Sequence, residues 1–165
     1  MTTNTLSNLN EMDEASVNAI MDAISKGASI RELQGIPDSV METIYAYAYK
    51  FYQTGRYKEA EVFFRFLVTF ESSNADYMMG LAAVMQEQKN YEKAIQAFGL
   101  AFALSTNNFR AILHMGQCFL NLKSTQKAKE CFEMVLQNEP NENLKAQAGA
   151  YLSAIVPSRQ EENHV

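Results

Sequence analysis

The side chains with the greatest potential for chemistry in this chain are two cysteines and two histidines. Cys118 and His114 lie four residues apart, so on a helix they would share a face, as a thiol and its activating base must. Nucleophilic catalysis also needs donors for an oxyanion, and no loop that could supply them accompanies this pair. We therefore expect a histidine on a helix surface beside a buried thiol, and a protein that is not an enzyme. A helical enzyme that uses these two residues is the least favoured alternative.

Metal and cofactor chemistry finds no support in the sequence motifs. The chain has no Cys-x-x-Cys pair, no His-Glu-x-x-His, no Gly-x-Gly-x-x-Gly and no P-loop string. Cys118 and Cys131 fall on apolar faces of predicted helices, which favours buried, reduced thiols in a reducing compartment. We expect no cofactor and no metal site.

Charge and hydropathy exclude further classes of partner. The net charge is −5, and Lys and Arg occur singly or in pairs rather than in a basic stripe, so direct binding to nucleic acid or to an anionic membrane is not expected. No run of about 18 apolar residues could span a membrane. The N-terminus lacks the basic start and apolar stretch of a signal peptide. These features predict a cytoplasmic protein whose partners are other proteins.

The elements that would position these side chains repeat with a period of 34 residues. Small residues recur at two positions of the repeat and an aromatic residue at a third, which is typical of tetratricopeptide helical hairpins. The repeat-core residues are Ala48, Ala82 and Gly116; Phe51, Met85 and Phe119; Ala60, Ala94 and Ala128; and Phe64, Phe98 and Phe132. Helices of a hairpin approach closely only where side chains are small, and the aromatic residues fill the space on either side.

The predicted fold is therefore all-α, with three tetratricopeptide hairpins in a right-handed superhelix. The predicted segments are a disordered start at 1–12, an N-terminal helical segment at 13–36, a repeat domain at 37–156 with repeats at 41–74, 75–108 and 109–142 and a capping helix at 143–156, and a disordered tail at 157–165. Ser29 with Glu32, and Ser39 with Glu42, have the spacing of capping boxes.

The first helix of each hairpin lines the inner wall of such a superhelix, so its inward positions define a candidate groove. The expected peptide-binding residues are Tyr45, Tyr49, Tyr52, Met79, Ala83, Gln86, Leu113, His114 and Gln117. The three tyrosines form a second apolar stripe beside the packing face made by Ile44, Tyr47, Ala48 and Phe51. A packed helix needs only one stripe, so the tyrosines either contact a ligand or are covered by the N-terminal segment.

The charge of the inner wall limits the kind of ligand. Its inward positions hold Glu42, Asp76 and Glu87 against Arg110 alone, a net charge of −2. A clamp for an acidic C-terminal peptide would need several basic residues there. We expect instead an extended segment that is apolar or contains proline.

Three stretches closely resemble the class II chaperones of bacterial type III secretion systems: KGASIRELQGIPDSVMETIY, IYAYAYKFYQTGRYKEAEVFFRFLVTF and DYMMGLAAVMQ. The similarity spans roughly residues 16–155. It implies a cytoplasmic, non-enzymatic chaperone that binds hydrophobic, pore-forming translocator proteins and keeps them soluble and ready for export. The client segment would lie extended in the concave groove, against Tyr45, Tyr49, Tyr52, Met79 and Ala83.

The resemblance also implies two further partners. Several such chaperones self-associate through N-terminal or first-repeat surfaces, and an apolar stripe suits a homodimer contact here; its residues are Val17, Ile20, Met21 and Ile24. Some also assist a transcriptional activator after export of their clients. The third repeat departs from the pattern at Lys123 and Thr125, which leaves its share of the groove open. The alternative function is a general scaffold that joins folded partner proteins.

Overall fold

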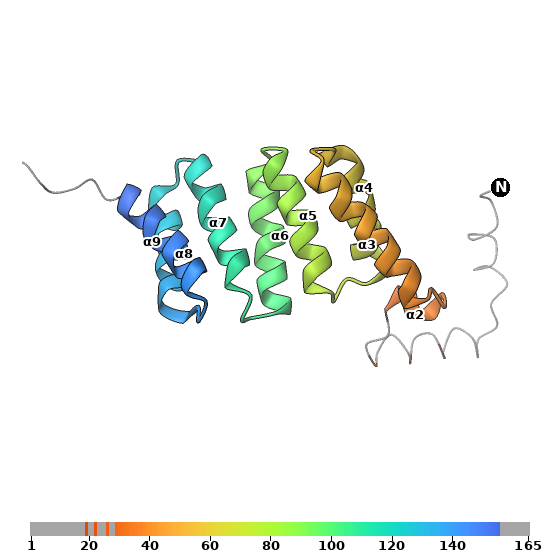
Figure 1. Ribbon diagram of the computed structural model, residues 1–165. Coiled ribbons are helices and arrows are strands. Elements are labelled where there is room, and N and C mark those ends of the chain that lie inside the picture. Colours follow the sequence, from red (N-terminus) through yellow and green to blue (C-terminus); the bar gives the residue numbers. More distant parts are fainter. Residues whose placement is uncertain (1–18, 20–21, 23–25, 27–28, 156–165) are drawn as a thin grey trace, which may run out of the picture.

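The computed structural model describes residues 19, 22, 26 and 29–155 (Figure 1). The helices described in full are α2 (Ile30–Leu33), α3 (Asp38–Gln53), α4 (Tyr57–Phe70), α5 (Ala75–Glu87), α6 (Tyr91–Leu104), α7 (Phe109–Asn121), α8 (Thr125–Asn138) and α9 (Glu142–Ile155). This confirms the predicted all-α class. The expected disorder at 1–12 and 157–165 and the dimer stripe Val17, Ile20, Met21 and Ile24 lie outside the described residues.

Three helical hairpins follow one another along the molecule: α3 with α4, α5 with α6, and α7 with α8 (Figure 1). The small repeat-core residues are fully buried at the helix crossings, and so are the aromatic residues Phe64, Phe98 and Phe132. Phe51 and Phe119 are only partly buried. The fold therefore depends on close helix approach at small residues, as the repeat predicts.

Two glycines allow the buried aromatic rings to come unusually close. A Cβ atom at Gly80 would lie 2.0 Å from Cε1 of Phe64, and one at Gly116 would lie 2.5 Å from Cε1 of Phe132. Any side chain at either position would overlap a ring. The helices α5 and α7 consequently pack directly onto phenylalanine faces.

The structure confirms one of the two predicted capping boxes and contradicts the other. The Ser29 backbone N–H donates to Glu32, and the Glu32 N–H donates to the Ser29 hydroxyl, so the capping box before α2 is confirmed. The second prediction is wrong, because α3 begins at Asp38 with Pro37 at the N-cap. Ser39 therefore lies inside the first turn, where its side chain cannot cap the helix.

The two ends of the stack are closed to different degrees. At the C-terminal end α9, which corresponds to the expected capping helix, buries Ala148 and stacks Tyr151 on Phe132 with 4.9 Å between ring centroids. At the other end Tyr47 is 52% exposed, whereas Leu81 at the same repeat position is 6% exposed. Tyr47 was expected on the packing face. The difference arises because the first hairpin covers Leu81, while no equivalent hairpin precedes Tyr47 within the described residues.

Candidate peptide-binding groove

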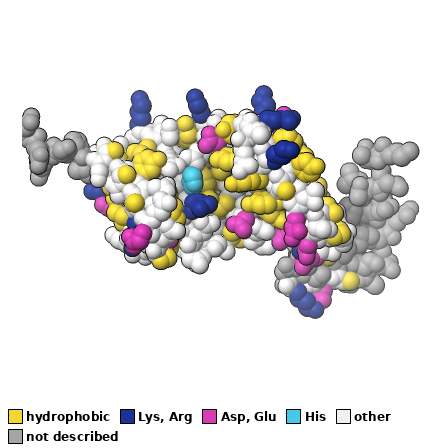
Figure 2. Space-filling model, in the orientation of Figure 1, with side chains coloured by type: hydrophobic (Ala, Val, Ile, Leu, Met, Phe, Trp, Pro, Cys, Tyr) yellow, Lys and Arg dark blue, Asp and Glu magenta, His cyan; other side chains and the backbone are white. Residues whose placement is uncertain are grey.

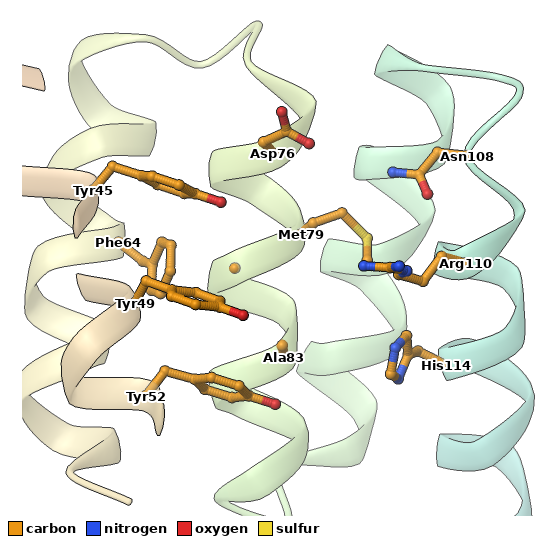
Figure 3. Close-up of a pocket in the computed structure, with 11 residues that line it drawn as sticks. Tyr45, Tyr49, Tyr52, Phe64, Asp76, Met79, Ala83, Asn108, Arg110 and His114 are labelled. Carbon is orange, nitrogen blue, oxygen red and sulfur yellow. The ribbon is translucent and has the colours of Figure 1, made fainter. Parts of the chain in front are cut away.

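A cavity of about 330 Å³ opens between α3, α5 and α7 (Figure 3). It is lined by Tyr45, Tyr49, Tyr52, Phe64, Asp76, Met79, Gly80, Ala83, Asn108, Arg110 and His114. Six of the nine residues expected from the sequence are among them: Tyr45, Tyr49, Tyr52, Met79, Ala83 and His114. Its volume lies in the range of binding pockets, about 300–1,000 Å³. Figure 2 shows hydrophobic side chains gathered over α3 and α5 on this face.

The three tyrosines of α3 form one wall of the cavity. Their rings follow one another at 6.5 Å and 6.4 Å between centroids, at interplanar angles of 20° and 27°. Figure 3 shows their hydroxyl groups directed toward α5. Burial raises the pKa of Tyr45 and, likewise, of Tyr52, with a further contribution from Asp76 to the first and from Glu87 to the second. Both phenols therefore stay neutral and can donate and accept hydrogen bonds beside an apolar ring.

The tyrosine wall is held in place by aromatic contacts with neighbouring elements. Tyr45 meets Phe64 of α4 edge-on at 6.0 Å and lies 5.6 Å from Tyr77 of α5, between ring centroids. Tyr52 lies 5.9 Å from Tyr57. In contrast, Tyr49 in the middle of the row is 49% exposed. This arrangement fixes the ends of the wall and leaves its centre open to a ligand.

Sequence reasoning assigned Phe64 to the core only, and missed its second role in the cavity. Phe64 is 1% exposed, yet it lines the cavity because Gly80 beside it has no side chain to cover the ring. A glycine at an inward position opposite the repeat-core aromatic residue of the preceding hairpin is the signal that could have revealed it. Asn108, which also lines the cavity, has no such signal, since it stands in the loop before α7.

The opposite side of the cavity is polar and comes from α7 and the loop before it. Figure 3 shows Asn108, Arg110 and His114 there, facing the tyrosine wall. The His114 ring stacks on Phe98 at 5.2 Å and 10°. Burial lowers the pKa of His114, an effect that its hydrogen bond to Gln117 partly opposes. The imidazole is therefore neutral near pH 7, and Arg110 carries the positive charge on this side.

Two expected groove residues, Gln86 and Gln117, join a hydrogen-bond network next to the cavity. Gln86 Nε2 donates to Gln117 Oε1 at 3.0 Å, and Gln117 Nε2 donates to the Tyr151 hydroxyl at 3.1 Å. His114 Nδ1 lies 3.1 Å from each of the two glutamine Oε1 atoms. Because both are acceptors in this network, Nδ1 carries the ring proton. The network ties α5, α7 and α9 together and orients His114.

Leu113 is a correction to the expected groove. It is 2% exposed and belongs to the hydrophobic cluster that α7 forms with α8 and α9. Its neighbours Ala111 and Ile112 are buried as well. The first turns of α7 are thus covered on more than one side, so Leu113 presents no surface to a ligand.

The geometry also speaks against a catalytic cysteine. Cys118 is fully buried, and burial raises the pKa of its thiol to about 12. The hydrogen bonds of His114 go to glutamines rather than to this thiol. A thiolate is the reactive species, and neither its formation nor its access to a substrate is favoured here.

Comparison with known families defines the class first. Models of the tetratricopeptide repeat match residues 41–74, 75–108 and 110–142, in the register of the hairpins and of the predicted repeats. The chain is therefore a tetratricopeptide-repeat protein.

Individual relatives narrow the class to one family. The chaperone protein SicA of Salmonella typhimurium is 42% identical over 154 residues, which cover 93% of each chain. The solved structure of PcrH with the chaperone-binding region of PopD has a TM-score of 0.69 at 30% identity, over 73% of this chain and 94% of that one. The Yersinia enterocolitica type III secretion translocator chaperone SycD shares the fold, with a TM-score of 0.72 at 23% identity over 78% of this chain and 98% of its own. The chain belongs to the class II chaperones of type III secretion systems.

Proposed function

We propose that this protein is a bacterial cytoplasmic chaperone for the hydrophobic translocator proteins of a type III secretion system. It holds an extended client segment in the groove between α3, α5 and α7, without catalysis, and keeps the client soluble and competent for export. The observation that carries the proposal is the open tyrosine wall, Tyr45, Tyr49 and Tyr52, in a member of this chaperone family.

The spacing of the tyrosine wall suits an extended chain. Successive rings are 6.5 Å and 6.4 Å apart, and two residues of an extended strand advance about 6.6–6.8 Å. A segment running along α3 would therefore meet a tyrosine at every second residue. Apolar side chains could lie against the rings and Met79, while the phenol groups bond to the exposed peptide groups of the segment.

Relatives supply the identity of the client class. PcrH has been solved with the chaperone-binding regions of PopD and of PopB, and SycD with a peptide of the translocator YopD. Membrane-active clients expose apolar surface that aggregates in water, and covering one segment at a non-covalent site leaves it free to be pulled away at export. Among the helices that the structure describes, none has the length and hydropathy of a membrane span.

The proposal also includes a homodimer and an association with a transcriptional activator. Both rest on the family resemblance alone. The stripe expected to form the dimer, Val17, Ile20, Met21 and Ile24, lies outside the described residues. The groove assignment does not depend on either association.

Co-expression tests the chaperone role against the scaffold alternative. A translocator from the same secretion system, produced alone, should be insoluble, and production with this chain should move it into the soluble fraction as a complex. Production with the Tyr45→Ala, Tyr49→Ala double variant should leave most of it insoluble. If the translocator stays insoluble with the parent chain, the chaperone function is refuted and a scaffold that joins folded partners becomes the better account.

A further inference from the structure

The client segment must match the charges of the groove as well as its apolar wall, and among the described residues Arg110 is the one Lys or Arg that lines the cavity. Building on the proposed function, we infer that the bound segment carries a carboxylate, which pairs with Arg110, next to an apolar side chain that enters between Tyr49, Met79 and Ala83. This makes Arg110 a specificity-determining residue of the groove.

Arg110 differs from the other arginines that the structure describes. Arg31 pairs with Asp38 and with Glu71, Arg56 with Glu59 at 2.8 Å, and Arg65 with Glu61 at 2.6 Å. Within the described part of the chain Arg110 has neither an ion pair nor a side-chain hydrogen bond, although its guanidinium faces the cavity in Figure 3. The chain thus leaves unused, at its ligand site, a group whose planar fork of donors suits a carboxylate.

The surroundings of Arg110 favour one carboxylate rather than an acidic stretch. Asn108 lies beside it and can add an amide donor, and neutral His114 does not compete for the anion. Asp76 lines the same cavity near Tyr45, whose pKa is raised first by burial and then by the charge of Asp76. A carboxylate at that end would meet repulsion, while one beside Arg110 would meet attraction. The two charges therefore favour a carboxylate on the α7 side of the cavity.

Peptide selection tests the inference even where the client sequence is unknown. A displayed library of random dodecapeptides would be selected against the full chain, against Arg110→Glu, and against Lys93→Glu. Lys93 is an exposed residue of α6 outside the cavity. Its substitution changes the net charge by the same amount as Arg110→Glu and therefore serves as the control. The parent and Lys93→Glu should enrich peptides with an Asp or Glu at a fixed distance from an apolar residue. Arg110→Glu should enrich Lys or Arg at that position instead.

Binding of one selected peptide gives the size of the effect. Its Asp→Asn or Glu→Gln version should bind the parent about twofold to fivefold more weakly, as for an exposed ion pair. The same neutral version should bind Arg110→Glu no more weakly than the acidic version does. Selection of apolar peptides without a preferred acid, or the same acid preference in Arg110→Glu, would overturn the inference and leave the groove standing. If the parent enriches no peptides, or if Tyr49→Ala enriches the same peptides as the parent, the groove itself is refuted and the inference with it.

Discussion

At the scale of single residues, His114 connects the ligand site to the interior. One face of its ring stacks on the buried Phe98, its Nδ1 lies between two glutamine oxygens, and its edge reaches the cavity. Protonation would place a charge in a partly buried site, close to Arg110, whose charge further lowers the pKa. The folded state therefore favours the neutral ring.

This preference predicts a pH dependence of stability. The pKa of His114 in the folded chain is below the value of about 6.5 for an unfolded histidine. Below that pH the unfolded state binds more protons, so the free energy of unfolding should fall as the pH decreases through and below this region. Denaturant titrations between about pH 7.5 and pH 5.5 should show a larger loss for the parent than for His114→Gln. Equal losses in the two proteins would contradict the neutral, buried assignment.

Residue-level prediction from the sequence succeeded where the repeat position determines the environment and failed where local packing does. Tyr49 and Ala83 could be placed in the groove from their repeat positions. Leu113 could not, because its burial depends on how α8 and α9 cover α7. The exposure of the Phe64 ring to the cavity likewise depends on a glycine of the next hairpin, which is a contact between repeats rather than a property of one.

At the scale of helices, α5 packs against α4 through Gly80, although a residue with a side chain would have the higher helix propensity at this position. In Gly80→Ala the new Cβ would lie 2.0 Å from Phe64, and the rigid ring cannot move aside within a packed core. We expect a loss of about 1–3 kcal/mol in the free energy of unfolding. Gly99→Ala in α6 is the matched control, because a Cβ there has no atom within 4 Å, and it should gain about 0.5–1 kcal/mol. Changes of the same sign in both variants, measured by chemical denaturation, would contradict this packing.

The turn of each hairpin contains one residue in the left-handed backbone conformation, and this residue is a glycine only in the first repeat. Gly55, Lys89 and Lys123 occupy the same repeat position with φ of 74°, 63° and 59°. A side chain with Cβ is strained in this conformation by roughly 1–2 kcal/mol, and the greater freedom of glycine in the unfolded chain offsets part of that. Lys123→Gly should therefore raise the free energy of unfolding by about 0.5 kcal/mol. Lys127→Gly, inside α8, should lower it by about 1 kcal/mol. A destabilised Lys123→Gly would mean that this turn is not strained.

The helices could be predicted because the sequence shows two patterns together. Apolar residues recur with the spacing of a helix, and the core residues recur with the period of the repeat. The expected repeats at 75–108 and 109–142 each contain one hairpin, α5 with α6 and α7 with α8. The start of α3 was not predictable from capping chemistry, since Pro37 occupies the N-cap position directly before Asp38, two residues earlier than the expected cap at Ser39.

At the scale of the whole molecule, a stack of hairpins makes one concave wall from helices that are distant in sequence. Tyr45 of α3, Met79 of α5 and His114 of α7 meet in a single cavity, and each is rigidly placed by the core of its own hairpin. The wall is therefore formed before a ligand arrives, which reduces the entropy lost on binding. Tyr47 is exposed on the opposite side of α3, so it can serve as a control for the groove tyrosines.

The most direct test of the account is the affinity for the client segment that survives limited proteolysis of the complex, measured by calorimetry. The Tyr45→Ala, Tyr49→Ala double variant should lose at least about 1–2 kcal/mol of binding free energy, since anchor side chains of this kind are removed. Tyr47→Ala, which removes a tyrosine of similar exposure from the same helix (52% against 49% for Tyr49), should bind as the parent does. Unchanged affinity in a double variant of intact helicity, or an equal loss in Tyr47→Ala, would contradict the placement of the client along the tyrosine wall.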